Sequence, residues 1–361
     1  MQIYNQNEWS DILIKYPKPD DYIKEHIWDK TRNLNLKKQI SLDQTIEDFE
    51  LLKSLDTKSL IKEGEIFSRY DYKWDIGNTY IDSCNVGNKS SNYFHQTSRW
   101  KCDSINSPSP ERNWNEKKFF FTLLNSLWSL KVKEVSLDTL RTCMSMRKYI
   151  ASQFRPSAAK CLYDHFGSEH ILDFSSGWGD RLSGAMSSSF VKQYMGIDPN
   201  EILFEGYRQQ INHFNKNKNI KMLSSPAEDI FQQSLVTKED IEPDMVFTSP
   251  PYFIVERYSK NNTQSWVRYK KLDKWLDGFL FPVITGCLSI LKTNGILAIN
   301  ISDVYCNHTI NHICDPMNDF INNTGLVKKI NNINYRMAKR TNSKSSKKGI
   351  FVEPIWIWRK I

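Results

Sequence analysis

The feature that most constrains the fold is an alternation of short apolar segments with helical segments between residues 150 and 361. The apolar runs predict buried strands, and between them apolar residues recur at helical spacing. Strands that alternate with helices form a parallel, doubly wound sheet covered on both faces. The expected strands are residues 170–174, 194–197, 220–223, 244–248 and 295–301, and the expected helices are residues 156–166, 181–188, 201–215, 227–235 and 273–291.

The end of the chain breaks this alternation. Two further strands, 327–335 and 350–358, follow each other around a basic linker with no helix between them. Such a pair predicts an antiparallel hairpin at one edge of the sheet. We therefore expect an α/β, Rossmann-like domain over residues 150–361.

Residues 1–149 have a different character, mostly helical and polar. A helix is expected to start at Ser41, and helical patterns return over residues 116–150. Residues 66–115 are rich in aromatic, Asn, Ser and Gly residues, which predicts short strands or loops. The aromatic side chains there could stack on nucleic acid or form a small core; they are Trp74, Tyr93, Phe94, Trp100 and Trp114. We expect an α+β accessory region, and a candidate target-recognition region, in this part.

Composition limits the setting of the protein. The seven cysteines are odd in number and scattered, which fits a reducing compartment. No apolar run is long enough to cross a bilayer, and the N-terminus lacks the pattern of a signal peptide. We expect a cytoplasmic, intracellular protein without membrane contact. The net charge of +8 permits a polyanionic partner.

Polar and special residues follow the ends of several predicted strands. Asp173 ends the first strand and leads into SSGWGD, where Gly177 and Gly179 allow a sharp turn close to a ligand. Asp198 ends the second strand, where doubly wound folds hold ribose hydroxyls. SPAED follows the third strand. Each residue alone could be a helix cap or turn, but together they predict a nucleotide-like ligand at this edge.

The fourth strand runs into Ser-Pro-Pro-Tyr, residues 249–252. Proline cannot donate to a sheet ladder, so the strand must stop there. The result is a stiff corner with Ser249 on one side and the ring of Tyr252 on the other. Its simplest role would be a rigid loop that closes a pocket. At this edge of an α/β sheet, however, such a corner is expected to bind a ligand.

This combination resembles the class I S-adenosylmethionine-dependent amino-methyltransferases. It is most similar to phage- and large-virus-type DNA methylases, in the order FRPSAAKCLYDHFG, SSGWGDRLSGAM, GIDPN, VFTSPPYF, QSW and LAINISD, over residues 150–310. The family pattern more often has glycine where this chain has Ser175. The resemblance implies S-adenosyl-L-methionine as cofactor, a seven-stranded class I methyltransferase domain and, as a candidate, a phage or viral origin. The implied cofactor-binding residues are Phe154, Arg155, Asp173, Ser175, Gly177, Trp178, Gly179, Asp198, Glu228 and Asp229.

The resemblance also implies chemistry at the corner. The Ser249 hydroxyl and the Pro250 carbonyl could accept hydrogen bonds from an exocyclic amine, Pro251 would keep the corner rigid, and Tyr252 could stack on a flipped base. Serine at the first position favours N4-cytosine over N6-adenine. The alternatives are an RNA base, a protein glutamine, or a catalytically silent, nucleic-acid-binding methyltransferase fold.

Two further segments carry candidate functions. The linker RMAKRTNSKSSKKG could contact phosphates or be a solvated hairpin loop; its candidate nucleic-acid residues are Lys339, Arg340, Lys344, Lys347 and Lys348. The segment YCNHTINHICD holds four metal-ligand types, but its spacing does not match the common zinc patterns, so no metal is expected. The expected partner is nucleic acid, with DNA favoured.

Overall fold

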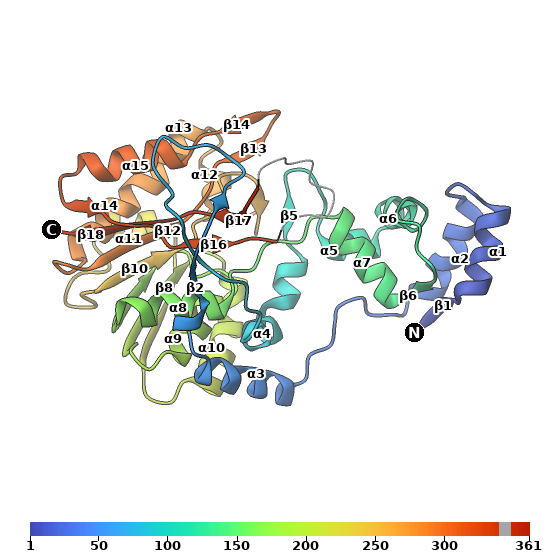
Figure 1. The fold of residues 1–361 in the computed structure, drawn as a ribbon, viewed down its shortest axis with the longest axis horizontal. Helices are drawn as coiled ribbons and strands as arrows, with labels where there is room; N and C mark the ends of the chain where they lie inside the picture. The colour runs from blue at the N-terminus through green and yellow to red at the C-terminus, as the bar shows by residue number, and fades with distance from the viewer. Residues whose placement is uncertain (339–347) are drawn as a thin grey trace. The chain divides into compact units, whose positions relative to one another are not determined.

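The computed structural model describes residues 1–338 and 348–361, which form two compact units (Figure 1). The sheet unit comprises Ser41–Gln96, Gln153–Val255 and Ser259–Ile361. The helical unit comprises Met1–Ile40, Thr97–Ser152 and Glu256–Tyr258.

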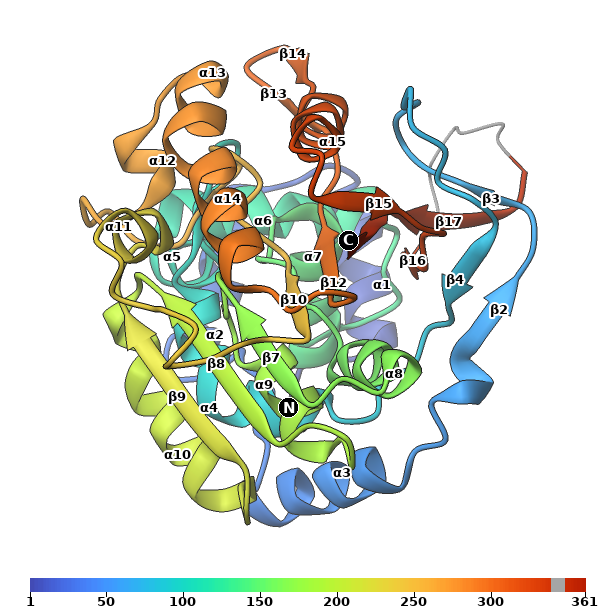
Figure 2. The ribbon, with the colours of Figure 1, turned by 90° about the vertical axis from the view of Figure 1, so that its left-hand side faces the viewer.

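A seven-stranded sheet forms the centre of the sheet unit, in the order β15-β18-β12-β10-β7-β8-β9 (Figure 2). β18 runs antiparallel to its neighbours, and β7 to β10 and β12 are parallel. Every residue of β10 and β12 is buried, as expected for strands covered on both faces. The strands are β7 (His170–Asp173), β8 (Gln193–Asp198), β9 (Asn219–Ser224), β10 (Met245–Thr248), β12 (Ile296–Asn300), β15 (Val327–Lys329) and β18 (Ile355–Lys360).

Helices cover both faces of this sheet (Figure 2). On one side lie α3 (Leu42–Ser54), α4 (Asn88–Trp100), α8 (Pro156–Phe166), α9 (Asp180–Ser187) and α10 (Phe204–Phe214). The short turn η2 (Glu201–Leu203) directly precedes α10. On the other lie α11 (Ala227–Gln232), α12 (Ser265–Arg268), α13 (Leu272–Trp275), the π-helical turn η3 (Leu276–Leu280), α14 (Phe281–Ile290) and α15 (Cys314–Asn323). The predicted doubly wound α/β fold is confirmed.

The expected C-terminal hairpin is present, but each of its two strands is split. β15 and β18 pair in the main sheet, whereas β16 (Asn334–Arg336) and β17 (Ile350–Glu353) pair in a second sheet. Pro354 separates β17 from β18, because it has no N–H to donate to a ladder.

The second sheet, which we call the small sheet, recruits residues from the N-terminal third of the chain. Its order is β2-β4-β16-β17-β3, with β2 (Ile61–Glu63), β3 (Ile66–Phe67) and β4 (Thr79–Ile81). Asn334 helps to hold it together, since its side-chain amide donates to the carbonyls of Ile76 and Thr79, each at 2.8 Å. The short turn η1 (Lys58–Leu60) precedes β2, and β13 (Val304–Cys306) forms a separate hairpin with β14 (Thr309–Asn311).

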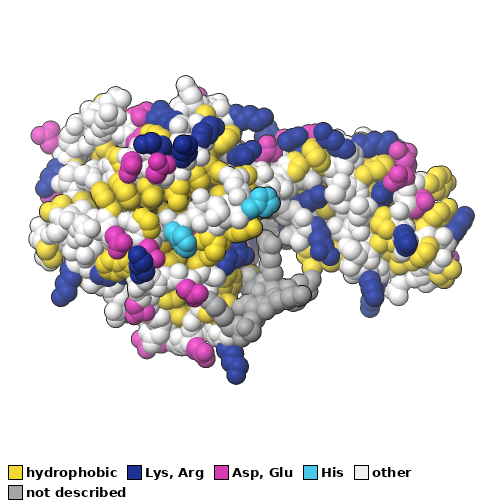
Figure 3. Space-filling model, turned by 90° about the horizontal axis from the view of Figure 1, so that it is seen from above, with side chains coloured by type: hydrophobic (Ala, Val, Ile, Leu, Met, Phe, Trp, Pro, Cys, Tyr) yellow, Lys and Arg dark blue, Asp and Glu magenta, His cyan; other side chains and the backbone are white. Residues whose placement is uncertain are grey.

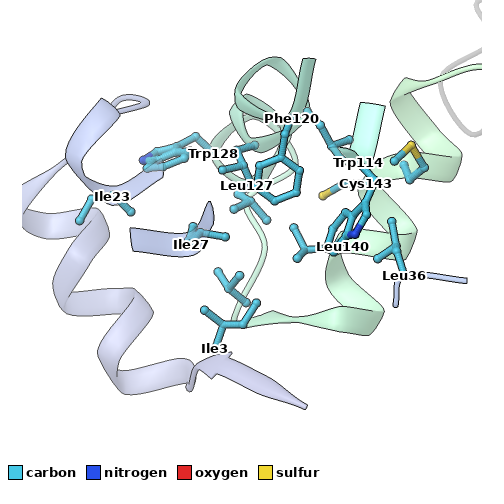
Figure 4. Packing of buried hydrophobic residues seen from close by; sticks show 14 of the residues in the cluster. Ile3, Ile23, Ile27, Leu36, Trp114, Phe120, Leu127, Trp128, Leu140 and Cys143 are labelled. Atoms are coloured by element: carbon cyan, nitrogen blue, oxygen red, sulfur yellow. The ribbon is translucent and has the colours of Figure 1, made fainter. Parts of the chain in front are cut away.

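The helical unit has its own apolar core (Figure 4). Trp9 and Trp128 meet edge to face, with ring centroids 5.2 Å apart. The guanidinium of Arg32 lies 3.3 Å from the ring centroid of Trp28 and donates to the carbonyl of Trp114 at 2.8 Å. Its elements are β1 (Gln2–Tyr4), α1 (Gln6–Lys15), α2 (Asp21–Thr31), β5 (Asp103–Ser104), α5 (Pro110–Asn115), α6 (Lys117–Ser129), β6 (Val135–Ser136), α7 (Leu137–Arg147) and β11 (Glu256–Arg257).

The division of the chain differs from the boundary at residue 150 that the sequence suggested. Residues 41–96 join the sheet unit, because β4 pairs with β16 and α3 packs near α9. Ser41 does cap α3, through a capping box with Gln44. The region expected to form strands or loops contains the helix α4. Among its aromatics, Trp114 lies in the core of the helical unit, and the Trp74 indole N–H donates to Asp319 at 2.9 Å.

Candidate functional site

The carboxyl ends of the parallel strands bring most of the predicted site residues to one edge of the main sheet. Asp173 is the last residue of β7 and pairs in register with Gly196 of β8. Asp198 ends β8 beside Ser224 of β9, and Thr248 ends β10 immediately before the Ser-Pro-Pro-Tyr corner. Ligands of open α/β sheets bind outside such carboxyl ends.

Asp173 is fully buried and holds this edge together. Its Oδ2 accepts hydrogen bonds from Arg181 Nε and from the Tyr194 hydroxyl, both at 2.7 Å, and its Oδ1 accepts from the Thr248 hydroxyl at 2.8 Å. Burial acts to lower the pKa of Arg181, but the neighbouring Asp173 carboxylate outweighs this effect and the net shift is upward. Asp173 therefore ties β7, β8, β10 and α9 to one another, and a direct contact with the cofactor stays a prediction.

The loop after β7 takes the sharp turn that its glycines suggested. Gly177 and Gly179 have φ angles of 60° and 71°, in the left-handed region that favours glycine. The Gly177 carbonyl accepts from the Tyr207 hydroxyl, and the carbonyl of the half-buried Ser175 accepts from the Arg181 guanidinium. Trp178, between the glycines, is buried. Side chains of α9 and α10 thus hold the backbone of the loop.

Helix α4 covers this glycine loop, and the sequence did not predict it. A Cβ at Gly179 would lie 2.3 Å from Gln210 Oε1 and 2.8 Å from His95 Nε2. Burial lowers the pKa of His95 to about 4, so its imidazole is neutral at pH 7. The hydroxyl of Ser91, also on α4, donates to Asp180 at the start of α9. The sequence signal in NKSSNYFHQTSRW was weak, because its Asn and Ser residues favour loops and turns.

Asp198 faces the glycine loop from the end of β8. Its Oδ2 accepts from the Gly177 N–H at 2.8 Å, and its Oδ1 accepts from the Asn200 N–H at 2.9 Å. Burial raises the pKa of Asp198 to about 6. This places an ionisable acceptor beside the loop, and its contact with a ribose stays a prediction.

Glu228 and Asp229 lie in the first turn of α11, beside the end of β9. Both bind Arg268 of α12, a residue that the sequence did not single out: Arg268 NH1 is 2.6 Å from Asp229 Oδ1 and 3.1 Å from Glu228 Oε1. Burial raises the pKa of Glu228 to about 7. The segment before α12 also contacts the end of β8, since the Thr263 hydroxyl donates to the carbonyl of Pro199, which follows β8, at 3.2 Å. Residues 263–268, which contain QSW, thus link the ends of β8 and β9.

The Ser-Pro-Pro-Tyr corner begins where β10 stops. Ser249 is half-buried, and its hydroxyl makes no hydrogen bond to another described residue. Pro250, which follows, is buried. The corner therefore presents a hydroxyl at the same edge as the glycine loop.

Backbone and side-chain contacts hold the second half of the corner. Phe253 has a φ of 53°, unusual for a residue other than glycine, and its N–H donates to the Pro251 carbonyl at 2.9 Å. The Tyr252 hydroxyl donates to Glu353 Oε1 at the end of β17. Glu353 was not predicted, because only the tertiary fold brings it to the corner.

Phe154 and Arg155 pack on β16. The ring of Phe154 stacks on Tyr335 with centroids 4.8 Å apart and meets Phe247 edge to face at 5.4 Å. Arg155 donates through NH1 to the Arg336 carbonyl at 3.0 Å. Both residues therefore have contacts within the fold, and their contact with a cofactor stays a prediction.

The basic linker and the segment YCNHTINHICD add no residue to the site at the strand ends. In the basic linker, Lys339, Arg340, Lys344 and Lys347 lie outside the described residues, and Lys348 is exposed. In YCNHTINHICD, Nδ1 of His312 lies 2.8 Å from Asp303 Oδ2, and Cys306 and Cys314 are buried. Within residues 1–338 and 348–361, no group of three His, Cys, Asp or Glu residues is placed to hold a metal ion. None of the described helices has the length and apolar character that crossing a membrane requires.

Comparison with known proteins gives a family match at the C-terminal part of the chain. The family model described as DNA methylase, N6_N4_Mtase, matches residues 243–360, which include the Ser-Pro-Pro-Tyr corner. No curated protein matches the chain.

Three similar solved structures share little sequence with this chain. TehB from Haemophilus influenzae is 9% identical, with a TM-score of 0.38 over 56% of this chain and 62% of that protein. TrmN from Thermus thermophilus is 13% identical, with a TM-score of 0.37 over 57% of this chain and 49% of that protein. The N-methyltransferase NodS from Bradyrhizobium japonicum, in complex with S-adenosyl-L-homocysteine, is 10% identical, with a TM-score of 0.36 over 57% of this chain and 85% of that protein.

The order and directions of the seven strands define the fold independently of these structures. A parallel sheet with one antiparallel strand, β18, between β12 and β15 is the expected class I methyltransferase arrangement. The family match supports methyl transfer as the reaction and S-adenosylmethionine as the methyl donor.

Proposed function

We propose that this protein transfers a methyl group from S-adenosylmethionine to the exocyclic amine of a DNA base, with N4 of cytosine favoured over N6 of adenine. The observation that carries the proposal is the half-buried Ser249 hydroxyl, which stands at the end of β10 on the edge that also holds the glycine loop. The match of residues 243–360 to a DNA methylase family supports DNA as the substrate.

Two orphaned polar atoms support a polar ligand beside Asp198. Asn200 Oδ1 and Gln264 Nε2 are buried without a hydrogen-bond partner among the described residues. Gln264 adjoins Thr263, whose hydroxyl binds the carbonyl of Pro199. Buried polar groups are normally satisfied, and a nucleoside offers both donors and acceptors. These residues therefore fit the adenosine part of S-adenosylmethionine.

The proposed cofactor site combines backbone and carboxylate groups. The turn at Gly177 and Gly179 lets the backbone approach the ligand, and Asp198 would accept from ribose hydroxyls. Glu228 and Asp229 would lie toward the adenine of the cofactor. Ser175 and Trp178 would contribute from the glycine loop itself. Phe154 and Arg155, which pack on β16, would contact the cofactor from that strand's side. S-adenosylmethionine supplies the activated methyl group and its leaving group, so the protein mainly orients the reactants.

At the corner, the chain would orient the amine. The lone pair of an exocyclic amine is delocalised into the base ring, which makes the amine a poor nucleophile. Acceptance of its N–H hydrogens by the Ser249 hydroxyl and the Pro250 carbonyl would direct the lone pair toward the methyl group. Pro251 restricts the backbone, and Tyr252 would stack on the flipped base.

The distribution of charge supports a nucleic-acid partner. The helical unit has 18 Lys and Arg residues against 12 Asp and Glu residues, so it carries +6 of the net charge of +8. Lys and Arg side chains spread over this unit in the view from above, several of them along one edge (Figure 3). We propose that this unit and the basic linker, including Lys348, contact phosphates, and that target recognition resides in residues 1–149.

The deciding experiment is identification of the product. The purified protein is incubated with S-adenosylmethionine and, in parallel, with mixed-sequence duplex DNA, RNA and protein, and the digested products are analysed by mass spectrometry. We expect N4-methylcytosine in DNA that is absent with Tyr252→Ala. N6-methyladenine in DNA would show that adenine, and not cytosine, is the target base. Methylation confined to RNA or to glutamine would overturn the proposal that DNA is the substrate. Cofactor binding by calorimetry with no methylated product would indicate a silent methyltransferase fold.

A further inference from the structure

Glu353 was given no role in orienting the amine, but its side chain contacts the Ser-Pro-Pro-Tyr corner directly. Glu353 Oε1 accepts a hydrogen bond from the Tyr252 hydroxyl, and both side chains belong to the sheet unit. Tyr252 ends the Ser-Pro-Pro-Tyr corner, whereas Glu353 ends β17, about a hundred residues later in the chain.

We propose that Glu353 is a positioning residue for Tyr252, fixing the plane of its ring against the target base. This inference rests on the proposed function, in which Tyr252 stacks on that base.

The geometry of a phenol suits this role. The phenolic O–H bond prefers to lie in the plane of the ring, so a fixed acceptor at the hydroxyl restrains the ring while leaving both faces open for stacking. A carboxylate acceptor makes the bond charge-assisted and stronger than a neutral one. A restraint on the Tyr252 side chain before the base binds reduces the conformational entropy that is lost on binding.

The position of Glu353 is itself well fixed. Its strand pairs with β16 on one side and β3 on the other, and Glu353 is in register with Tyr335. The rings of Phe67 and Phe351 stack across the second pairing, with centroids 5.4 Å apart. Pro354 follows Glu353 and restricts its backbone.

In this proposal, the small sheet supports the strand that carries Glu353. Its strands β2, β3 and β4 come from residues 61–81, and they hold the two C-terminal strands that carry Tyr335 and Glu353. Through Glu353, a segment from the N-terminal third of the chain would support the base-binding corner.

The test is a double-mutant cycle in the full-length protein. The variants are Tyr252→Phe, Glu353→Ala and their combination, with Glu353→Gln as the conservative change. Glu63→Ala is the matched control, since Glu63 is an exposed carboxylate on β2 of the same small sheet. The readouts are kcat and KM for DNA methylation, and the affinity for S-adenosylmethionine by calorimetry.

We expect Glu353→Ala to lower kcat by about 10- to 100-fold, the effect of losing a hydrogen bond to a charged group, with cofactor affinity unchanged. Tyr252→Phe should give a similar loss, and the double variant should be no worse than the poorer single variant. Glu353→Gln, which keeps an acceptor oxygen, should lose less. An unchanged kcat in Glu353→Ala, or losses that multiply in the double variant, would overturn the inference.

A second readout does not depend on activity. With fluorotyrosine incorporated, the ¹⁹F NMR signal that disappears in Tyr252→Phe belongs to Tyr252. It should shift in Glu353→Ala and not in Glu63→Ala; an unmoved signal would overturn the contact. If the signal shifts in Glu353→Ala but the wild-type protein methylates no substrate, the result would count against the proposed function alone.

Discussion

The backbone N–H of Gly177 donates to Asp198 Oδ2 at 2.8 Å, which joins the loop after β7 to the carboxylate at the end of β8. These two groups come from neighbouring strand ends, so in the proposed cofactor site a ligand at the loop would also meet the carboxylate. Its protonation state should therefore control cofactor affinity.

We predict that S-adenosylmethionine binding weakens as the pH falls through about 6. Burial raises the pKa of Asp198 to about 6, so the carboxylate is ionised above this pH and protonated below it. If ribose hydroxyls donate to the ionised form, full affinity is present above pH 6 and falls by up to tenfold for each pH unit below it. Calorimetric titration between pH 5 and 8 would measure this.

Two variants separate the carboxylates that titrate in this range. Asp198→Asn should bind the cofactor weakly with a flat pH profile. Glu228→Gln should keep the dependence near pH 6, although burial raises the pKa of Glu228 to about 7. A wild-type profile in Asp198→Asn would contradict the assignment of the pH dependence to Asp198.

A glycine pair tests how tightly the loop is packed. Gly179 and Gly325 both have left-handed φ angles, 71° and 66°, but only the Cβ of an alanine at position 179 would have close neighbours among the described residues. Gly325→Ala should cost about 1–2 kcal/mol of unfolding free energy from backbone strain. Gly179→Ala should cost about 1–3 kcal/mol more, because of overpacking against Gln210 and His95. Urea unfolding would measure both, and equal costs would count against tight packing.

How far the sequence predicts this fold depends on whether the signal is local. The strand–helix alternation is local, and β7, β8 and β10 begin and end within two residues of the predicted bounds. The small sheet is not local, because β4 pairs with β16 across most of the chain length, in register at Tyr80 and Asn334. No periodicity in residues 66–115 could indicate that partner.

The same distinction applies to the candidate site. The glycine loop and the Ser-Pro-Pro-Tyr corner are contiguous motifs, so sequence alone found them. Arg268 and Glu353 reach the site only through tertiary contacts with Asp229 and Tyr252. Asp173 was found as a candidate cofactor ligand, but a sequence motif does not reveal that Arg181, Tyr194 and Thr248 also bind it.

The buried ion pair at the strand ends should be essential for folding. Asp173→Ala would leave the buried guanidinium of Arg181 without its carboxylate, and breaking such a pair costs about 3–5 kcal/mol. Glu205→Ala removes the partner of Arg208 in a pair at the surface, and should not change stability measurably. Chemical denaturation would compare the two, and a tolerated Asp173→Ala would refute the structural role of Asp173.

The Ser249 hydroxyl should act on catalysis and not on cofactor binding. If it accepts a hydrogen bond from the amine, Ser249→Ala should lower kcat by about tenfold or more, with unchanged affinity for S-adenosylmethionine. Ser289→Ala, an exposed serine of α14, serves as the control. Methylation kinetics and calorimetry would be measured together. A variant that loses cofactor affinity to the same extent would point to a structural role for Ser249.

Charge on the helical unit should set the salt dependence of DNA binding. Lys131 and Lys133 are exposed in the loop between α6 and β6, in the unit that carries +6. If both neutralise phosphates, Lys131→Gln/Lys133→Gln should weaken binding to all duplex sequences alike. The slope of log affinity against log salt concentration should become shallower by about 0.9 for each phosphate that is no longer neutralised. Fluorescence anisotropy over a range of KCl concentrations would measure the slope.

The control for this charge prediction uses two lysines of the sheet unit. Lys216 and Lys292 precede β9 and β12, at the amino ends of those strands and away from the proposed ligand edge. Lys216→Gln/Lys292→Gln removes the same charge from the protein, so it corrects for the general effect of net charge. An equal change of slope in both double variants would show that the helical unit attracts DNA only through overall charge. A larger change in the Lys131/Lys133 variant would show that this loop contacts the phosphate backbone.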